Sequence, residues 1–301
     1  MDRIMNKYRM FFVLLLLPVM ALAAGDTGMA ALKIGVSARA SAMGESFSAV
    51  ADDASGLFWN PAGTAWAVKR QAGFTYNQWI QDISHQTAGM VIPTSHGSFG
   101  LGLMLNSMDG FERRTIASDE PLGTFSTQDL ALVMNYSRKV GERMSLGANV
   151  RYLYEKIYIE TSSGYAVDLG ARYRLMEGLY AGAAVQNLGS MSEMAVESLK
   201  LPRTIRAGAA WYVPVGSNPQ NLLLSLDYVD YQGDGGHVHT GVEYSPVSAV
   251  SLRAGYQTGY EERSLSAGFG LKFSVFMLDY AYVPFSNDLG NSQRFSVSVD
   301  F

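Results

Sequence analysis

Two histidines are the best candidates for a metal site in this sequence. His237 and His239 stand two positions apart, so on a β-strand both side chains would point to one face and could share a metal ion. A zinc site also needs nearby Cys, His or carboxylate ligands, and no such cluster accompanies the pair beside its Gly-rich turn. The pattern favours a solvated pair at the rim of a sheet, and we expect no bound metal and no cofactor.

Asp52 and Asp53 are the second candidate for cation binding. Neighbouring carboxylates can bind calcium, but the regularly spaced oxygen ligands of a calcium-binding loop are absent around this pair. Aspartate commonly caps a turn or the start of a helix, and we expect that role here. Outer-membrane hydrolases use Ser/His or Asp/His pairs, and no matching motif is found. The sequence therefore predicts a protein that is not an enzyme.

Charged side chains of both signs recur at alternate positions within otherwise apolar segments. Alternate residues of a strand share a face, so these charges are predicted to face the interior of a barrel. A general porin lines an open channel in this way, but unpaired charges in a narrow, partly dry lumen are costly. We therefore expect the charges to pair with one another and with a segment that fills the lumen. The predicted lumen-facing charges are Arg151, Asp168, Arg172, Arg174, Glu243 and Arg253.

Strands with alternating faces are the elements that would position these side chains. Segments 145–154, 165–174 and 264–273 alternate apolar residues with small or polar ones. The C-terminal segment is the plainest case, and its apolar set is Phe295, Val297, Val299 and Phe301. About fourteen such segments can be counted, each of the ~10-residue length that a tilted strand needs to cross a membrane. They begin near residues 70, 86, 97, 126, 143, 164, 178, 203, 221, 237, 248, 263, 275 and 293.

The bulky apolar residues form one continuous face around the whole chain, and the charges lie opposite. A soluble β-sandwich would show the reverse, with an apolar inner face and a charged outer one. The pattern predicts an all-β fold, a transmembrane antiparallel up-and-down β-barrel of about 14 strands in outer-membrane lipid. The longest excursions, 108–124 and 186–202, are expected to be extracellular loops. Aromatic residues near strand ends indicate a membrane-interface girdle: Tyr152, Tyr154, Tyr173, Trp211, Tyr212 and Tyr244.

The N-terminus has the parts of a cleaved signal peptide. Arg3, Lys7 and Arg9 precede an apolar run that is too short to span a membrane, and small residues follow at 21–23. We expect residues 1–23 to be the signal peptide of a protein exported to the bacterial outer membrane. The formal net charge of −4 gives no basic footprint for nucleic acid.

Residues 24–68 do not alternate as strands do. Ala31, Ile34, Ala38 and Ala42 have a short helical spacing, and an Asn-Pro step favours an extended or turn conformation at Asn60. A segment with so little charge is expected to fill the lumen rather than hang free, because wide barrels leave space inside. The predicted domains are therefore the signal peptide (1–23), an N-terminal hatch inside the lumen (24–68) and the barrel (69–301).

The run ADDASGLFWNPAG, which follows SARASAMGESFSAV, resembles the N-terminal hatch of the FadL-like family, especially of its PorV/PorQ branch. The ending LDYAYVPFSNDLGNSQRFSVSVDF resembles the last two strands of that branch, and the pieces QNLG and LPR are similar to its recurrent ones. The resemblance implies a fourteen-stranded barrel with an N-terminal plug. Residues that match the hatch motif or stand beside it are Asn60, Pro61, Ala62, Asp52 and Asp53.

Two functions stay open from this resemblance. FadL-like proteins admit hydrophobic small molecules such as long-chain fatty acids, which implies transport of such a ligand. PorV and PorQ act in type IX secretion, which implies binding of a secreted or surface protein at the outer face. The terminal aromatic Phe301 also resembles the signal that the barrel-assembly machinery recognises.

Overall fold

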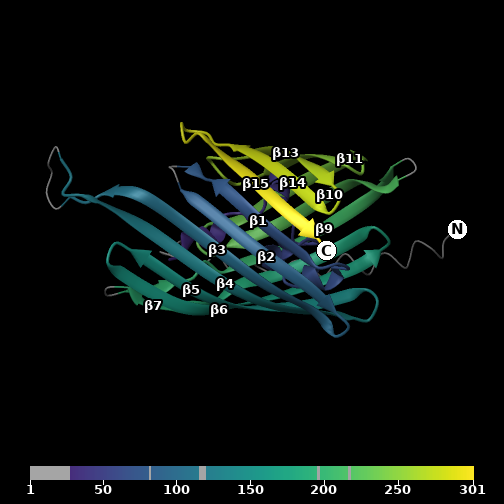
Figure 1. The fold of residues 1–301 in the computed structure, drawn as a ribbon, viewed down its shortest axis with the longest axis horizontal. Coiled ribbons are helices and arrows are strands. Elements are labelled where there is room, and N and C mark those ends of the chain that lie inside the picture. The colour runs from purple at the N-terminus through teal and green to yellow at the C-terminus, as the bar shows by residue number, and fades with distance from the viewer. Residues whose placement is uncertain (1–27, 81–82, 115–119, 195–196, 216–217) are drawn as a thin grey trace.

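The computed structural model describes residues 28–80, 83–114, 120–194, 197–215 and 218–301. The predicted signal peptide lies outside the described residues. Within them, fourteen long antiparallel strands form a closed barrel, and the short β8 is a fifteenth strand (Figure 1). The strands are β1 (Gln71–Gln78), β2 (Ser84–Thr94), β3 (Gly97–Glu112), β4 (Thr124–Val140), β5 (Met144–Ile157), β6 (Glu160–Met176), β7 (Leu179–Met194), β8 (Glu197–Lys200), β9 (Thr204–Val215), β10 (Asn218–Tyr231), β11 (Gly235–Val247), β12 (Val250–Gln257), β13 (Leu265–Phe273), β14 (Phe276–Pro284) and β15 (Asn291–Asp300).

Each long strand pairs with the next along the chain, and β1 pairs with β15 to close the barrel. Closure leaves the fourteen-stranded wall without a free edge, so its strands can pair their backbone groups on both sides. β8 pairs only with β7, and β9 therefore takes the next place in the wall. The predicted barrel of about fourteen strands is confirmed.

The two ends of the barrel differ. We call the end with the tight turns 95–96, 141–143, 177–178 and 274–275 the turn end, and Phe301 lies there. The opposite end, with the connections 79–83, 113–123, 232–234, 258–264 and 285–290, is the loop end.

The two predicted extracellular loops are partly strand. β3 continues to Glu112, so the first excursion is shorter than expected. The second predicted loop, residues 186–202, is largely strand, because β7 continues to Met194 and β8 pairs back onto it as a hairpin. Extending the pairing satisfies backbone groups that a loose loop would leave to water.

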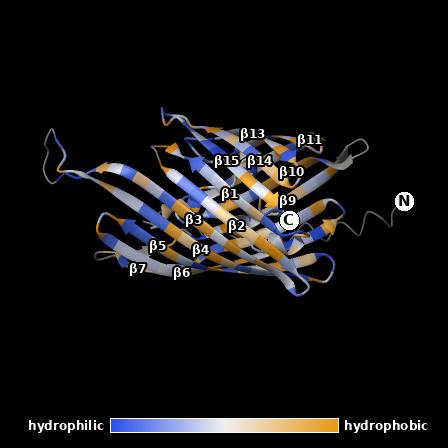
Figure 2. Ribbon diagram, in the orientation of Figure 1, coloured by the Kyte–Doolittle hydropathy of each residue, from blue (hydrophilic) through white to orange (hydrophobic). Residues whose placement is uncertain are grey.

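Hydropathy alternates along the strands, with bands of opposite character next to each other (Figure 2). The large apolar side chains of the C-terminal strand face outward, with Phe295, Val297 and Phe301 exposed and Val299 half-buried. Tyr212 does not belong to the predicted outer girdle. Its side chain points inward, and its hydroxyl donates to Asp52 Oδ2 at 2.6 Å. No helix among the described residues is long and apolar enough to cross a membrane.

Residues 28–67, which we call the internal segment, lie inside the barrel and contain four short helices. These are η2 (Ala30–Lys33), α1 (Ala38–Ala42), α2 (Gly56–Trp59) and η3 (Gly63–Trp66). The helical spacing at 31–42 was partly wrong, because the chain leaves η2 in extended form at Ile34 before α1 begins.

The internal segment crosses the whole lumen. At the loop end, the Gly28 amide donates to the Lys200 carbonyl at 3.0 Å. At the turn end, Trp66 Nε1 donates to Ser145 Oγ at 2.9 Å. Inward glycines of the wall make room for it: a Cβ on Gly147 would overlap the backbone of Pro61. The barrel in this structure is therefore filled with protein from end to end.

Candidate functional site

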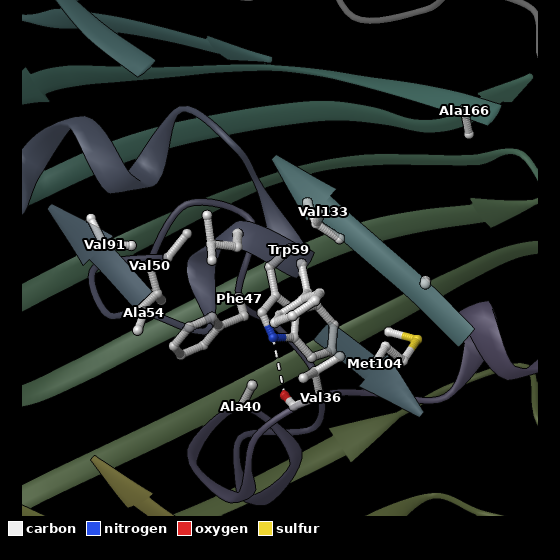
Figure 3. Packing of buried hydrophobic residues seen from close by; sticks show 14 of the residues in the cluster. Val36, Ala40, Phe47, Val50, Ala54, Trp59, Val91, Met104, Val133 and Ala166 are labelled. Carbon is white, nitrogen blue, oxygen red and sulfur yellow. Dashed lines mark hydrogen bonds between the residues drawn. The ribbon is translucent and has the colours of Figure 1, made fainter. Parts of the chain in front are cut away.

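An apolar core fills the middle of the lumen, and Trp59 and Phe47 are at its centre (Figure 3). The two rings meet edge to face with centroids 6.1 Å apart, and Trp59 Nε1 donates to the Val36 carbonyl at 3.1 Å. The barrel contributes inward side chains such as Met104 and Val133. Burial of these two rings holds the internal segment in place, because aromatic side chains remove a large apolar area from water.

Arg39 of α1 is the centre of an ion-pair network. Its Nη1 lies 2.6 Å from Asp52 Oδ1, and its Nε lies 2.8 Å from Glu243 Oε2 on β11. Glu243 also accepts from Arg253 Nε at 2.6 Å, and Arg253 Nη1 lies 2.6 Å from Asp279 on β14. The predicted lumen charges Glu243 and Arg253 are thus brought together, and the network joins the internal segment to the wall.

A second buried pair lies on the other side of the lumen. Arg151 Nε donates to Asp168 Oδ2 at 2.6 Å, and both side chains are almost fully buried. Asn149 Nδ2 and the Asn187 amide donate to the same carboxylate, each at 2.8 Å. Asp168 is therefore fully hydrogen-bonded, which is the condition under which a buried carboxylate is tolerated.

The remaining two predicted lumen charges lie toward the turn end. Arg172 Nε donates to the Ala49 carbonyl of the internal segment at 2.7 Å, and its guanidinium lies over the Tyr180 ring. Arg174 is only half-buried and donates to the Glu142 carbonyl at 3.1 Å. Arg172 thus holds the internal segment, and Arg174 stays near the rim.

The Asn-Pro-Ala step, Asn60 to Ala62, forms a hydrogen-bonded turn against the wall. Asn60 is extended, with φ −152° and ψ 107°, as the following proline predicts. Its Nδ2 donates to the Ser48 carbonyl at 2.7 Å, and its Oδ1 accepts from the Ala62 amide at 3.1 Å. The Pro61 carbonyl accepts from Asn135 on β4 at 3.2 Å. These residues fix the path of the internal segment rather than carry chemistry.

The two aspartates of the segment have separate roles. Asp53 Oδ1 accepts from the Ser55 amide at 2.9 Å, so it caps the turn before α2 as expected. Asp52 accepts from Arg39 and Tyr212, and Asp53 also makes a longer contact with Arg39, at 3.4 Å. The sequence alone did not point to Arg39, although it stands out as the single arginine of a segment with few charges.

The prediction of a solvated histidine pair was wrong. His237 and His239 do share the inward face of β11, but both are buried. Tyr260 covers them: its ring stacks on His237 with centroids 4.0 Å apart, and its hydroxyl lies 3.0 Å from His239 Nε2. The connection 258–264 folds over this part of the rim, which no local pattern in the strand reveals. The described residues contain no group of three or more His, Cys, Asp or Glu placed to hold a metal.

Two cavities remain beside the internal segment. One has a volume of about 40 Å³, is partly open to the outside, and lies against β1, β2, β14 and β15. Its lining includes Arg39 and Phe58 inside and reaches Phe74 and Val297, whose side chains are exposed on the outer face.

The other cavity has a volume of about 20 Å³, is also partly open, and lies nearer the loop end. Its apolar lining includes Leu32, Ile34, Val36, Trp59 and Met104, and its polar lining is Arg151, Gln186, Asn187 and Arg206. Most of its accessible wall is polar, and it has room for about one water molecule unless the internal segment moves.

Comparison with solved structures shows the same barrel fold. The toluene transporter TbuX of Ralstonia pickettii superimposes with a TM-score of 0.60 at 13% identity, over 89% of this chain and 98% of that one. A FadL homologue of Pseudomonas aeruginosa gives 0.64 at 15% identity, over 92% and 100%. The toluene transporter TodX of Pseudomonas putida gives 0.63 at 14% identity, over 89% and 99%.

A search of curated proteins found no match. A family model described as type IX secretion system protein PorV matches residues 23–191, which is more than half of the chain. The match and the fold agree with the resemblance noted in the sequence and with an outer-membrane location. This chain belongs to the PorV family of outer-membrane β-barrels.

Proposed function

We propose that this barrel admits small hydrophobic molecules across the outer membrane. The cavity between the internal segment and β3, β5, β7 and β9, toward the loop end, carries the proposal. It is small in this structure, but apolar side chains of the segment and of the wall, such as Trp59 and Met104, meet there, so a shift of the segment would open space between them. A ligand would enter from the loop end, which faces the cell exterior, and displace part of the internal segment. That segment would then act as a hatch.

The cavity beside β1 and β15 gives this route a second part. Its lining includes Phe74 and Val297, which pair with each other across the β1–β15 seam, so a local opening of that seam would connect the cavity to the lipid. The solved structures with the same fold include toluene transporters, and this supports the class of substrate proposed here. At a sequence identity near 14%, the shared fold does not indicate a particular substrate.

Filling the cavity tests the proposal. Met104 lines it, whereas its neighbour Leu105 points outward and is 41% exposed. We expect Met104→Trp to reduce uptake of radiolabelled toluene or long-chain fatty acid in a porin-deficient host toward the empty-vector level. Leu105→Trp, the matched control, should take up as much as the unmodified protein. Equal uptake by both variants, at equal amounts of folded barrel, would contradict the proposal.

A second function is favoured by the family match over residues 23–191. In it the barrel is a component of a protein-secretion machinery and binds a cargo or partner protein at the loop end. The proposal predicts that tagged protein purified from its own host carries secreted proteins with it. Replacing the loop-end connection 258–264 by a short Gly-Ser turn should remove them, and the same exchange at the turn 141–143 should not. Purification of a clean monomer would count against this role.

A further inference from the structure

Two arginines contact one carboxylate of the internal segment toward the loop end, and a third acts on it from farther away. Glu45 Oε1 lies 3.5 Å from Arg294 Nη1 and 3.6 Å from Arg263 Nη1, and Arg206 adds to the positive potential there. Burial raises the pKa of the Glu45 carboxyl, but Arg263 and Arg294 outweigh burial and hold that pKa below its ordinary value. Glu45 is therefore an anion in a pocket with an excess of positive charge.

The pairing in this cluster is incomplete. Charge-assisted hydrogen bonds are usually about 2.7–2.9 Å long, and those of Arg39 and Arg253 fall near that range. Both Glu45 contacts are longer, and Glu45 Oε2 has no hydrogen-bond partner. Arg294 is fully buried, yet its Nε and Nη2 have no partner either, and the same is true of Arg206 Nη1. Buried donors of this kind are rare and point to an acceptor that Glu45 only partly supplies.

Aromatic rings hold these arginines in place. The guanidinium groups of Arg263 and Arg294 lie 5.5 and 5.0 Å from the centroid of Trp79, and that of Arg263 lies 4.6 Å from the centroid of Tyr260. Ring faces attract a cation without neutralising it. The positive groups therefore keep both their position and their charge when the carboxylate between them is exchanged.

The cluster adjoins the small cavity nearer the loop end. The Glu45 carboxylate packs against Gly35, where a Cβ would overlap it, and Gly35 and Arg206 both line that cavity. Glu45 also has a φ of 61°, in the left-handed region that a residue with a side chain rarely adopts. The residue that carries the carboxylate is thus in an unfavourable backbone conformation, beside a small cavity that loss of the Glu45 side chain would enlarge.

We infer that Arg206, Arg263 and Arg294 form a carboxylate-binding site, that Glu45 of the chain itself fills it in this structure, and that a small carboxylic acid can displace Glu45. Displacement would break the ion pairs of the internal segment with Arg294 on β15 and with Arg263 of the connection 258–264. The inference does not rest on the proposed passage of hydrophobic molecules, because the exchange can occur whether or not anything crosses the barrel.

Chemical rescue tests the site. Purified protein in detergent is heated to a series of temperatures before electrophoresis. Glu45→Ala should lower the temperature at which the fast-migrating band of the folded barrel disappears. Sodium propionate should restore a few degrees of this loss when present at about ten times its Kd. Propionamide, which has the same shape without the charge, and inorganic phosphate should restore less. Glu155→Ala is the matched control, because Glu155 is also buried and accepts from the Met29 amide, but no arginine acts on its carboxyl.

Each outcome of this experiment either supports the site or overturns it. Rescue of Glu45→Ala by propionate that is lost in Glu45→Ala/Arg294→Gln supports the site. Equal rescue of Glu45→Ala and Glu155→Ala, equal rescue by propionamide, or better rescue by phosphate would overturn it. If Glu45→Ala does not fold, the unmodified protein still serves: propionate should speed hydrogen exchange at residues 44–48 relative to propionamide. No difference between the two would also overturn the inference.

Discussion

At the scale of single residues, Arg39 makes the contacts whose loss is easiest to foresee. It is largely buried and joins Asp52 to Glu243, so Arg39→Gln leaves Asp52 without its cation and Glu243 with Arg253 alone. Breaking a buried pair from one side costs roughly 3–5 kcal/mol, and we expect a loss near the lower end. Lys33→Gln is the control, because its pair with Asp234 is half exposed and such pairs contribute about 0–1 kcal/mol. Urea unfolding followed by tryptophan fluorescence measures both, and similar losses would contradict the assignment.

The sequence predicted which wall residues carry the lumen charges but not their partners. Alternation alone predicts an inward Arg253 or Asp168, because it depends only on neighbours two positions away. The partner of Glu243 is Arg39, 204 positions away in the chain, and no local spacing reveals a contact of that kind. The same limit applies to His237, which Tyr260 covers from a different connection, and to Glu45, whose arginines come from the far end of the chain.

At the scale of elements, inward glycines decide whether the internal segment fits. A Cβ on Gly147 would overlap the Pro61 carbonyl and the Ala62 amide. We expect Gly147→Val to leave the barrel assembled but to dislodge the segment, with faster cleavage of residues 28–67 by added protease in detergent. Ala148→Val changes the next residue, on the outward face of β5, and should leave cleavage unchanged. Slow cleavage of both variants would show that the segment tolerates the change.

The strands were predictable as elements, and their extensions were not. Predicted starts near 70, 97, 143 and 178 lie within a residue or two of β1, β3, β5 and β7, because lipid outside and a polar lumen inside impose the alternation. The hairpin of β7 and β8 was missed because its residues stand beyond the membrane-facing part of the wall. There the alternation is no longer required, and backbone pairing alone sets the structure.

At the scale of the whole molecule, the outward face of the terminal strand bears on assembly. Phe301 is 59% exposed at the turn end. We expect Phe301→Ser to lower the amount of heat-modifiable barrel in the outer membrane severalfold, as a terminal recognition signal requires. Phe273 lies on β13 near the same end and is 81% exposed, so Phe273→Ser removes as much exposed aromatic surface without touching the terminus. Comparable barrel levels in the two variants would contradict a special role for the last residue.

The position of Ser296 has a consequence for the order in which the molecule is built. Its Oγ accepts from the Ala38 amide of the internal segment and also meets Thr75 Oγ1 across the β1–β15 pairing. The internal segment, which is synthesised early, is therefore enclosed by the C-terminal strand, which is synthesised last. The β1–β15 pairing closes around a segment that already lies in the lumen. Contacts of such sequence separation form slowly. We therefore expect the barrel wall to close and the internal segment to fill the lumen in a single step, so that no assembly intermediate is both closed and empty.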